Sequence, residues 1–340
     1  MTDSNFWKDL SRPITAMAPM SGVTDVAFRW MVVKYSRYGG DEIGEYGEEK
    51  LPEVHSGGPD VIYTEFISAD GLFLGDKKEL LEDMRYSDVE RPIVAQFFSS
   101  DPGRMKEAAS LARELSFDGV DINLGCPDRS VCKQGAGSEL IRSPEVARKV
   151  MKAVKEGAGP LPVSVKTRAG YYSDDELEDW LGALLSEKPS ALVLHARTRK
   201  DMYKEPARWS LVERAVKLRD SLGSDTLILG NGDIASLEDL HQKVKNSGAD
   251  GAMVGRSLLG TPGFFSGAPS PSPEDRLRTL IEHCKLFERL HGMSRNFAFM
   301  KKHFKPYVSG WEQAKELRSA LMSADSAEEV ESIIKEHGYL

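Results

Sequence analysis

The stretch TLILGNGD covers residues 226–233. It starts as a short apolar and β-branched run and ends in Gly-Asn-Gly-Asp. A near-continuous apolar run without alternation is typical of a strand buried on both faces, as in a parallel sheet. Glycines directly after such a strand let backbone N–H groups approach an anion closely. The stretch therefore predicts a parallel strand followed by an anion-binding turn.

Seven further runs of this kind, each followed by a helix-like segment, cover residues 14–19, 61–68, 92–98, 119–125, 162–168, 191–197 and 251–257. Helix starts are indicated by Asp101-Pro102, by Ser143-Pro144, by Ser173, and by Ser236 with Asp239. Eight βα units in roughly 250 residues predict an α/β fold of the (β/α)₈, or TIM, barrel type. A doubly wound sheet is the alternative, but no GxGxxG follows the first strand.

The C-terminal part has a different pattern. Residues 266–273, SGAPSPSP, read as a linker, and no strand-like run follows them. Apolar residues then recur at i, i+3, i+4 and i+7, as in an amphipathic helix: Leu277, Leu280, Ile281, Cys284 and Phe287. We expect a barrel domain over 1–265, this linker over 266–273, and a small α-helical domain over 274–340.

Composition narrows the class of protein. The 340 residues are 40% hydrophobic, which suffices for a sizeable core. An odd count of three cysteines without metal-type spacing predicts neither a disulfide framework nor a metal site and fits a reducing compartment. The sequence lacks a signal-peptide pattern and an unbroken apolar run of membrane length. We expect a cytoplasmic protein, a monomer, with no membrane partner.

Charge is segregated along the chain. The net charge is -8, yet residues 39–58 hold six acids against Lys50, and residues 276–305 hold eight bases against two acids, a local charge of +6. The acidic segment joins the first helix to the second strand, where we expect a mobile loop on the barrel face opposite the site. The basic run is typical of either a solvated helix face or an RNA-binding surface.

Chemistry in such barrels gathers where strands end. The residues at these ends are Pro19 and Met20, Gln96, Asn123 with Cys126, Lys166 with Arg168, His195 with Arg197, Asn231 to Asp233, and Gly255-Arg256. The last two groups predict a phosphate cup, and hence a phosphorylated cofactor. Cys126 lies between a glycine and a proline at a turn, a poor place to pack a structural thiol.

Seven ordered motifs resemble the tRNA-dihydrouridine synthase family: APMSGVTDVAFR, YTEFISADGL, NLGCPDRSVCKQGAGSELIRSPE, SVKTRAG, LHARTRKDMYKEPARW, GNGDI and GRSLLGTPGFF. The resemblance covers roughly residues 13–265 and continues more loosely beyond them. It implies FMN in the barrel mouth, NADPH (or NADH) as reductant, and reduction of specific uridines in tRNA, which the helical domain grips. The target base would leave its stack to reach the flavin.

The resemblance also implies roles for single residues. Cys126 would be the catalytic acid that protonates C5 of uracil, since a thiol with a pKa near ~8.5 is protonated at neutral pH. Lys166 would neutralise the reduced flavin, and Gln96 with Ala18, Pro19 and Met20 would contact its ring. The remaining cofactor contacts would be His195, Asn231, Gly232, Asp233, Gly255 and Arg256, and the substrate or RNA contacts Asn123, Arg168, Arg197, Lys301, Lys302 and Lys305.

Other interpretations stay open on the sequence alone. Cys132 and His195 have structural interpretations, and Lys166 has one as a surface ion pair. A flavin-dependent barrel reductase of a free pyrimidine or other small enone would share the cofactor site but would not need a basic helical domain. A non-catalytic RNA-binding barrel protein would carry no flavin. Visible absorption and activity on free uridine separate these alternatives.

Overall fold

The computed structural model describes residues 5–40, 44–49, 57–75, 77–292 and 294–340. By their contacts the chain forms two compact units that interleave along the sequence. The barrel unit comprises residues 1–21, 59–86 and 91–254, and the helical unit comprises residues 22–58, 87–90 and 255–340. The predicted domain boundaries at residues 265 and 273 stay a prediction.

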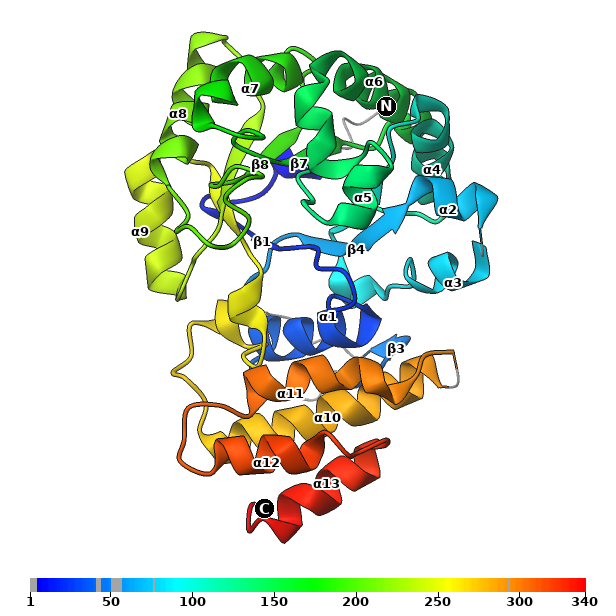
Figure 1. Ribbon diagram of the computed structural model, residues 1–340, viewed down its shortest axis with the longest axis vertical. Coiled ribbons are helices and arrows are strands. Elements are labelled where there is room, and N and C mark those ends of the chain that lie inside the picture. The colour runs from blue at the N-terminus through cyan, green and yellow to red at the C-terminus, as the bar shows by residue number, and fades with distance from the viewer. Residues whose placement is uncertain (1–4, 41–43, 50–56, 76, 293) are drawn as a thin grey trace. The chain divides into compact units, whose positions relative to one another are not determined.

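Within the described residues, the barrel unit contains eight parallel strands in one sheet, in the order β1-β10-β9-β8-β7-β6-β5-β4. A parallel bridge between Ala16 and Val61 links the two edge strands, so the sheet closes on itself as a barrel (Figure 1). All eight predicted strands are confirmed. Their bounds are β1 (Ile14–Met17), β4 (Ile62–Ser68), β5 (Ile93–Phe98), β6 (Gly119–Leu124), β7 (Val163–Arg168), β8 (Ala191–His195), β9 (Leu227–Asn231) and β10 (Gly251–Val254).

Helices alternate with these strands, and successive helices pack on one another around the sheet. The predicted starts are confirmed: Asp101 and Ser236 each cap a helix by accepting a backbone N–H, and Ser173 forms a capping box with Glu176. The helices are α2 (Ala69–Leu74), α3 (Lys77–Glu82), α4 (Pro102–Glu114), α5 (Arg129–Lys133), α6 (Pro144–Ala158), α7 (Leu177–Leu185), α8 (Ser210–Ser221) and α9 (Leu237–Ser247).

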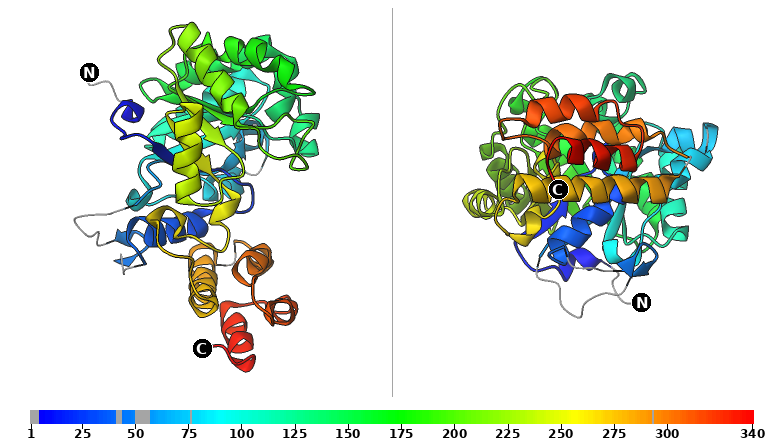
Figure 2. Two further views of the ribbon diagram at one scale, coloured as in Figure 1. Left: turned by 90° about the vertical axis from the view of Figure 1, so that its left-hand side faces the viewer. Right: turned by 90° about the horizontal axis from the view of Figure 1, so that it is seen from below.

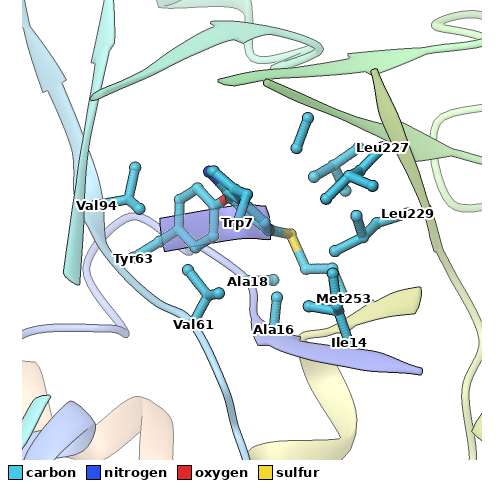
Figure 3. Close-up of a cluster of buried hydrophobic side chains, with 12 residues drawn as sticks. Trp7, Ile14, Ala16, Ala18, Val61, Tyr63, Val94, Leu227, Leu229 and Met253 are labelled. Carbon is cyan, nitrogen blue, oxygen red and sulfur yellow. The ribbon is translucent and has the colours of Figure 1, made fainter. Parts of the chain in front are cut away.

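Apolar side chains fill one end of the barrel interior. Trp7, from the 3₁₀ turn η1 (Phe6–Lys8) that precedes β1, is buried among Ile14, Val94, Leu229 and Met253, and these side chains point toward one another (Figure 3). Filling the interior with side chains makes the barrel a packed core and not a pore. The polar residues of the candidate site follow or end the same strands.

The helical unit is built on a long helix, α10 (Pro273–His291), which packs against α1 (Val26–Val32), α11 (Lys301–Tyr307) and α13 (Ala327–Glu336), and α12 (Ala314–Leu321) packs on α11 and α13 (Figure 2). The predicted stripe is confirmed, because all five of its residues are buried in α10. Within the described ranges, no helix combines the length and apolar character needed to cross a membrane.

The expected loop in the acidic segment is described only in part. Two short antiparallel strands, β2 (Gly44–Glu45) and β3 (Glu48–Glu49), pair within it. Residues 41–43 and 50–56 of the segment lie outside the described residues. Its mobility and its place on the face opposite the site stay predictions.

The helical unit buries a cluster of imidazoles between α1, α10 and α11. The rings of His283 and His303 lie 4.8 Å apart, and His283 Nδ1 lies 3.4 Å from the Tyr307 hydroxyl. The carboxylate of Asp25, which caps α1, lies 3.6 Å from His291 Nε2. Burial lowers the pKa of His283 to about 4, against an opposing effect of Asp25 and in the same direction as His291 and Lys302. At neutral pH the His283 ring is therefore uncharged.

This cluster predicts acid sensitivity. The unfolded chain binds a proton at His283 below pH 6.5, but the folded chain resists it until about pH 4, so stability present at neutral pH is lost as the pH falls through that window. The loss from this ring is about 3 kcal/mol at most. Urea unfolding of the full chain between pH 7 and 4.5 should show a clearly shallower decline in His283→Gln than in wild type. Equal slopes would contradict this assignment.

Candidate functional site

Strand register gathers the predicted polar residues at one rim of the barrel. Cα partners on adjacent strands pair Asn123 with Lys166, Arg168 with His195, and His195 with Asn231. Side chains at the same register of parallel strands face the same side of a sheet, so neighbouring strands present neighbouring groups. Lys166 Nζ donates to Asn231 Oδ1 at 3.2 Å, two strands away. The rim is therefore one connected polar site.

The loop that carries Cys126 is tied down by a carboxamide. Asn123 Oδ1, at the end of β6, accepts the backbone N–H groups of Gly125 at 3.1 Å and of Cys126 at 2.9 Å. Asn123 Nδ2 donates to Gln96 Oε1 at 3.1 Å. Gln96 is fully buried and Asn123 is nearly so. These contacts fix the cysteine directly after the strand end.

The Cys126 side chain is half-buried and packs against an apolar cluster of Phe66, Phe98, Val131 and Ala136. Burial raises the pKa of the Cys126 thiol above its ordinary value, against a smaller lowering by the backbone N–H of Asp128. The group is therefore a protonated thiol at neutral pH. It can donate a proton and is a poor nucleophile.

Cys132 supports the same loop. Its Sγ lies 3.8 Å from the Cys126 carbonyl oxygen and 3.5 Å from Ser138 Oγ, and Ser138 N donates to that carbonyl at 3.0 Å. Gly137 has a φ of +60°, and a Cβ there would lie 2.8 Å from the Cys126 carbonyl oxygen. This contact is closer than a side chain tolerates, so the turn needs glycine.

Lys166 provides a cation at the rim. Burial lowers the pKa of Lys166 to about 8, helped by the charge of Arg168 and opposed by Asp121 and Cys126. The ammonium is still mostly protonated at pH 7, but it is poorly solvated. A buried cation whose partner is the neutral Asn231 carboxamide gains from an anionic ligand.

Arg197 joins His195 to Asp233. Its Nη1 lies 3.0 Å from His195 Nε2, its Nη2 donates to Asp233 Oδ2 at 2.5 Å, and its Nε donates to the Glu205 carbonyl at 2.6 Å. A guanidinium only donates, so His195 Nε2 accepts and the neutral ring carries its hydrogen on Nδ1. Arg197 is 2% exposed, and its N–H groups form hydrogen bonds within the protein. Its contacts are those of a residue that orients His195.

Arg168 also forms its hydrogen bonds within the protein. Its Nε donates to the Gly125 carbonyl at 2.9 Å, and its Nη1 donates to the carbonyls of Thr198 at 3.0 Å and Met202 at 3.1 Å. The guanidinium carbon lies 5.4 Å from the centroid of the Tyr203 ring. Arg168 is 1% exposed. It therefore ties the Cys126 loop to the loop after β8.

The turn after β9 requires glycine at position 232. Gly232 has a φ of +123°, and a Cβ there would lie 2.8 Å from Ala207 Cβ and 3.1 Å from the His195 ring. The Asp233 carboxylate accepts from Arg197 and from Ala207 N. Gly255 and Arg256 follow β10 directly along the chain and belong to the helical unit. The barrel unit alone thus holds the Asn231–Asp233 half of the predicted phosphate cup.

The remaining predicted residues lie as follows. Ala18 and Pro19 are buried directly after β1, with Ala18 N donating to the Val254 carbonyl at 2.7 Å, and Met20 is partly exposed. The predicted RNA contacts Lys301, Lys302 and Lys305 lie on α11 of the helical unit, where Lys301 Nζ is 3.1 Å from Asp325 Oδ1 and Lys302 Nζ is 4.9 Å from the Phe299 ring centroid.

Two residues of this site were not predicted. Asp121 lies within β6 and accepts from Gln96, and Tyr203 packs near Arg168 and His195. The available signal for Asp121 was a carboxylate inside a fully buried strand, two residues before Asn123. Among the described residues, no three His, Cys, Asp or Glu side chains are placed to hold a metal ion.

These features define a (β/α)₈-barrel protein with a thiol, a buried cation and a glycine turn at one rim. The model of the dihydrouridine synthase family matches residues 16–337, and the chain belongs to this family. It is 35% identical over 335 residues to a probable tRNA-dihydrouridine synthase of Staphylococcus aureus strain COL, covering 98% of this chain and 95% of that protein. It is also 35% identical over 336 residues to probable tRNA-dihydrouridine synthase 2 of Bacillus subtilis strain 168, covering 97% and 95%.

A comparison of folds agrees with the barrel. Histamine dehydrogenase from Rhizobium sp. 4-9 superposes with a TM-score of 0.52 at 14% identity, over 80% of this chain and 48% of that one. At this identity the likeness concerns the fold alone.

The Arg168 contacts predict a stability effect. Arg168→Ala leaves three carbonyl oxygens without their donor, and we expect the unfolding free energy to fall by about 3 kcal/mol or more. Arg142→Ala removes a surface ion pair with Glu139 and a cation–π contact with Tyr171, and should cost far less. Urea unfolding of both variants measures the difference. Similar midpoints for the two variants would show that the Arg168 contacts do not hold the loop.

Proposed function

We propose that this protein is a tRNA-dihydrouridine synthase that reduces the C5–C6 double bond of specific uridines in tRNA, with FMN as cofactor and NADPH, or NADH, as reductant. Membership of the dihydrouridine synthase family supports the reaction and a flavin, and the names of its two bacterial relatives support the tRNA substrate. The observation that carries the proposal is a protonated thiol held at the same barrel rim as a buried ammonium. We place the protein in the cytoplasm as a monomer.

The residues present fit a flavin. The rim offers an ammonium, two carboxamides and an imidazole, a donor set that suits the polar edge of an isoalloxazine ring and its negative charge on reduction. We assign Lys166 to neutralise that charge and Gln96, His195, Ala18, Pro19 and Met20 to hold the ring. Because the Asp233 carboxylate is engaged by Arg197, its contribution to a phosphate would come from the backbone.

The phosphate of FMN would be held by Asn231, Gly232, Asp233, Gly255 and Arg256. Glycines after strands admit backbone N–H groups to an anion, and Arg256 would add a charge-assisted hydrogen bond. When bound, a reduced flavin supplies a hydride to C6 of uracil. The chain itself has to bind the base, exclude water and deliver a proton to C5.

Cys126 is the proposed proton donor. Reduction of uracil adds a hydride at C6 and a proton at C5, and the proton leaves Sγ of Cys126 as the hydride arrives. A thiol whose pKa is raised by burial stays protonated in the ground state and is ready to donate. Asn123 positions that thiol through the backbone, and Arg168 and Arg197 act on substrate through the loops and the imidazole that they orient.

Separate assays of the two half-reactions test this proposal. The wild type should purify yellow and form dihydrouridine in tRNA. Cys126→Ala should keep its flavin and oxidise NADPH at a wild-type rate, while dihydrouridine formation, measured by nucleoside mass spectrometry, falls by roughly 100-fold or more, the usual worth of a positioned acid.

Cys132→Ala is the matched control, since it removes a thiol that makes only weak contacts to the same loop. It should lose little activity. Equal losses in the two variants would remove the assigned role of Cys126. A colourless protein that cannot be reconstituted with FMN, or activity on free uridine without tRNA, would favour the alternative functions.

We propose that the basic run from Arg276 to Lys305 binds the phosphates of tRNA. Affinity for nucleic acid follows the local density of Lys and Arg and falls with salt, by roughly 0.7 to 0.9 in the slope of log K against log salt for each phosphate contact. Changing Lys301, Lys302 and Lys305 to Glu should weaken tRNA binding and flatten that slope. The flavin spectrum should not change.

Charge-matched controls lie on the outer helices of the barrel unit. Lys106, Lys149 and Lys217 are exposed on α4, α6 and α8, and changing them to Glu alters the net charge by the same amount. Filter binding at several salt concentrations compares the two triple variants. If both weaken binding equally, only the overall charge matters, and the basic run is a solvated face.

A further inference from the structure

A chain of hydrogen bonds connects the interior of the barrel to Cys126. Ser164 Oγ donates to Asp121 Oδ1 at 2.5 Å, Gln96 Nε2 donates to Asp121 Oδ2 at 2.7 Å, and Asn123 Nδ2 donates to Gln96 Oε1 at 3.1 Å. Asn123 Oδ1 then accepts the N–H groups of Gly125 and Cys126. The participating side chains come from the adjacent strands β5, β6 and β7. We call the part from Asp121 through Gln96 and Asn123 to the Cys126 backbone the amide relay.

The two ends of the amide relay impose the same direction on it. An ionised carboxylate only accepts, so Gln96 must turn its NH₂ group toward Asp121 and its oxygen toward Asn123. A backbone N–H only donates, so Asn123 must turn its oxygen toward Cys126 and its NH₂ group toward Gln96. Each carboxamide has two orientations, and only one orientation of each satisfies both ends. The buried carboxylate therefore fixes the orientation of both carboxamides from the interior end of the relay.

The position of this carboxylate is costly. Asp121 and Gln96 are fully buried, and burial raises the pKa of Asp121 to about 6 against the lowering effects of Ser164, Gln96 and Lys166. The Tyr63 side chain, on β4, extends into the same interior (Figure 3). The groups that face Asp121 are thus Tyr63, Gln96, Ser164 and Lys166. A buried carboxylate that burial disfavours is typical of a site where function requires the charge.

We propose that Asp121 is a positioning residue for the reaction, which acts through Gln96 and Asn123 to hold the Cys126 backbone. The inference rests on the proposed function for its consequence in catalysis. Its geometry concerns the chain alone.

Protonation would open the amide relay. A neutral Asp121 carries a hydrogen that it can donate, so Gln96 is no longer forced to present its NH₂ group, and its oxygen is free to turn away from Asn123. The carboxamides of the relay are accordingly held in one orientation above about pH 6, and this constraint is lost below it. Asp121→Asn cannot ionise and should lack this transition.

Ser164→Ala provides a sharper variant. The Ser164 hydroxyl stabilises the ionised form of Asp121, so its removal raises the pKa of Asp121 and moves the transition to higher pH. Ser164 contacts neither Gln96 nor Asn123 in the relay. A purely structural role of Asp121 would not move a titration midpoint in this way.

The test is the rate at which N-ethylmaleimide labels Cys126 between pH 5 and 8, read at the Cys126 peptide by mass spectrometry and divided by the rate for N-acetylcysteine. Division removes the intrinsic thiolate dependence. In the wild type the relative rate should rise by roughly fivefold on acidification through about pH 6, the worth of one net hydrogen bond. It should be flat in Asp121→Asn and should change at higher pH in Ser164→Ala.

An unchanged transition in Asp121→Asn, or an unmoved midpoint in Ser164→Ala, would overturn the proposal. Flat labelling in a protein that forms dihydrouridine rejects the relay alone. Labelling that titrates as expected in a protein without flavin or activity rejects the proposed function and leaves the relay in place.

Discussion

The Asn123 carboxamide is the interaction on which the geometry of the rim depends. Where the chain leaves β6, its N–H groups lose the ladder partners of the sheet and need new acceptors in a buried place. Asn123 Oδ1 supplies one acceptor for both Gly125 and Cys126. Its own nitrogen is satisfied by Gln96 on β5. The position of the thiol is therefore set by the register between two strands and not by the loop itself.

The buried cations at the rim have two kinds of role: the two arginines hold the local structure, and Lys166 is available to a ligand. Arg168 and Arg197 donate hydrogen bonds to carbonyl groups, an imidazole and Asp233. Their guanidinium groups therefore hold the loops and the His195 ring in place. Lys166 instead donates to the neutral Asn231 carboxamide, and burial sets its pKa. A cation that the fold leaves poorly compensated is the one best able to stabilise an incoming anion.

Local patterns predicted the eight strands, the helix starts and the stripe of α10, because burial on both faces, capping and the period of 3.6 residues are properties of short segments. The rim residues were predictable as a set, since parallel strands bring their carboxyl ends together. The structural role of Arg168 was not predictable, because its partners are the carbonyls of Gly125, Thr198 and Met202. No local sequence pattern gives the positions of those loop carbonyls. Asp121 was missed because it lies inside β6, and the site was predicted from the residues at the strand ends.

His283 in the helical unit and Asp121 in the barrel unit respond to acid in opposite directions. In the helical unit, His283 has a pKa below its ordinary value, so the folded state holds the proton less tightly than the unfolded chain and acid destabilises it. In the barrel unit, Asp121 has a pKa above its ordinary value, so the folded state holds the proton more tightly and acid relieves the cost of a buried charge. The charge on Asp121 at neutral pH thus reduces the stability of the barrel. A fold selected for stability alone would place an uncharged residue at position 121. A fold that must hold the carboxamides of Gln96 and Asn123 in one orientation next to Cys126 benefits from the carboxylate.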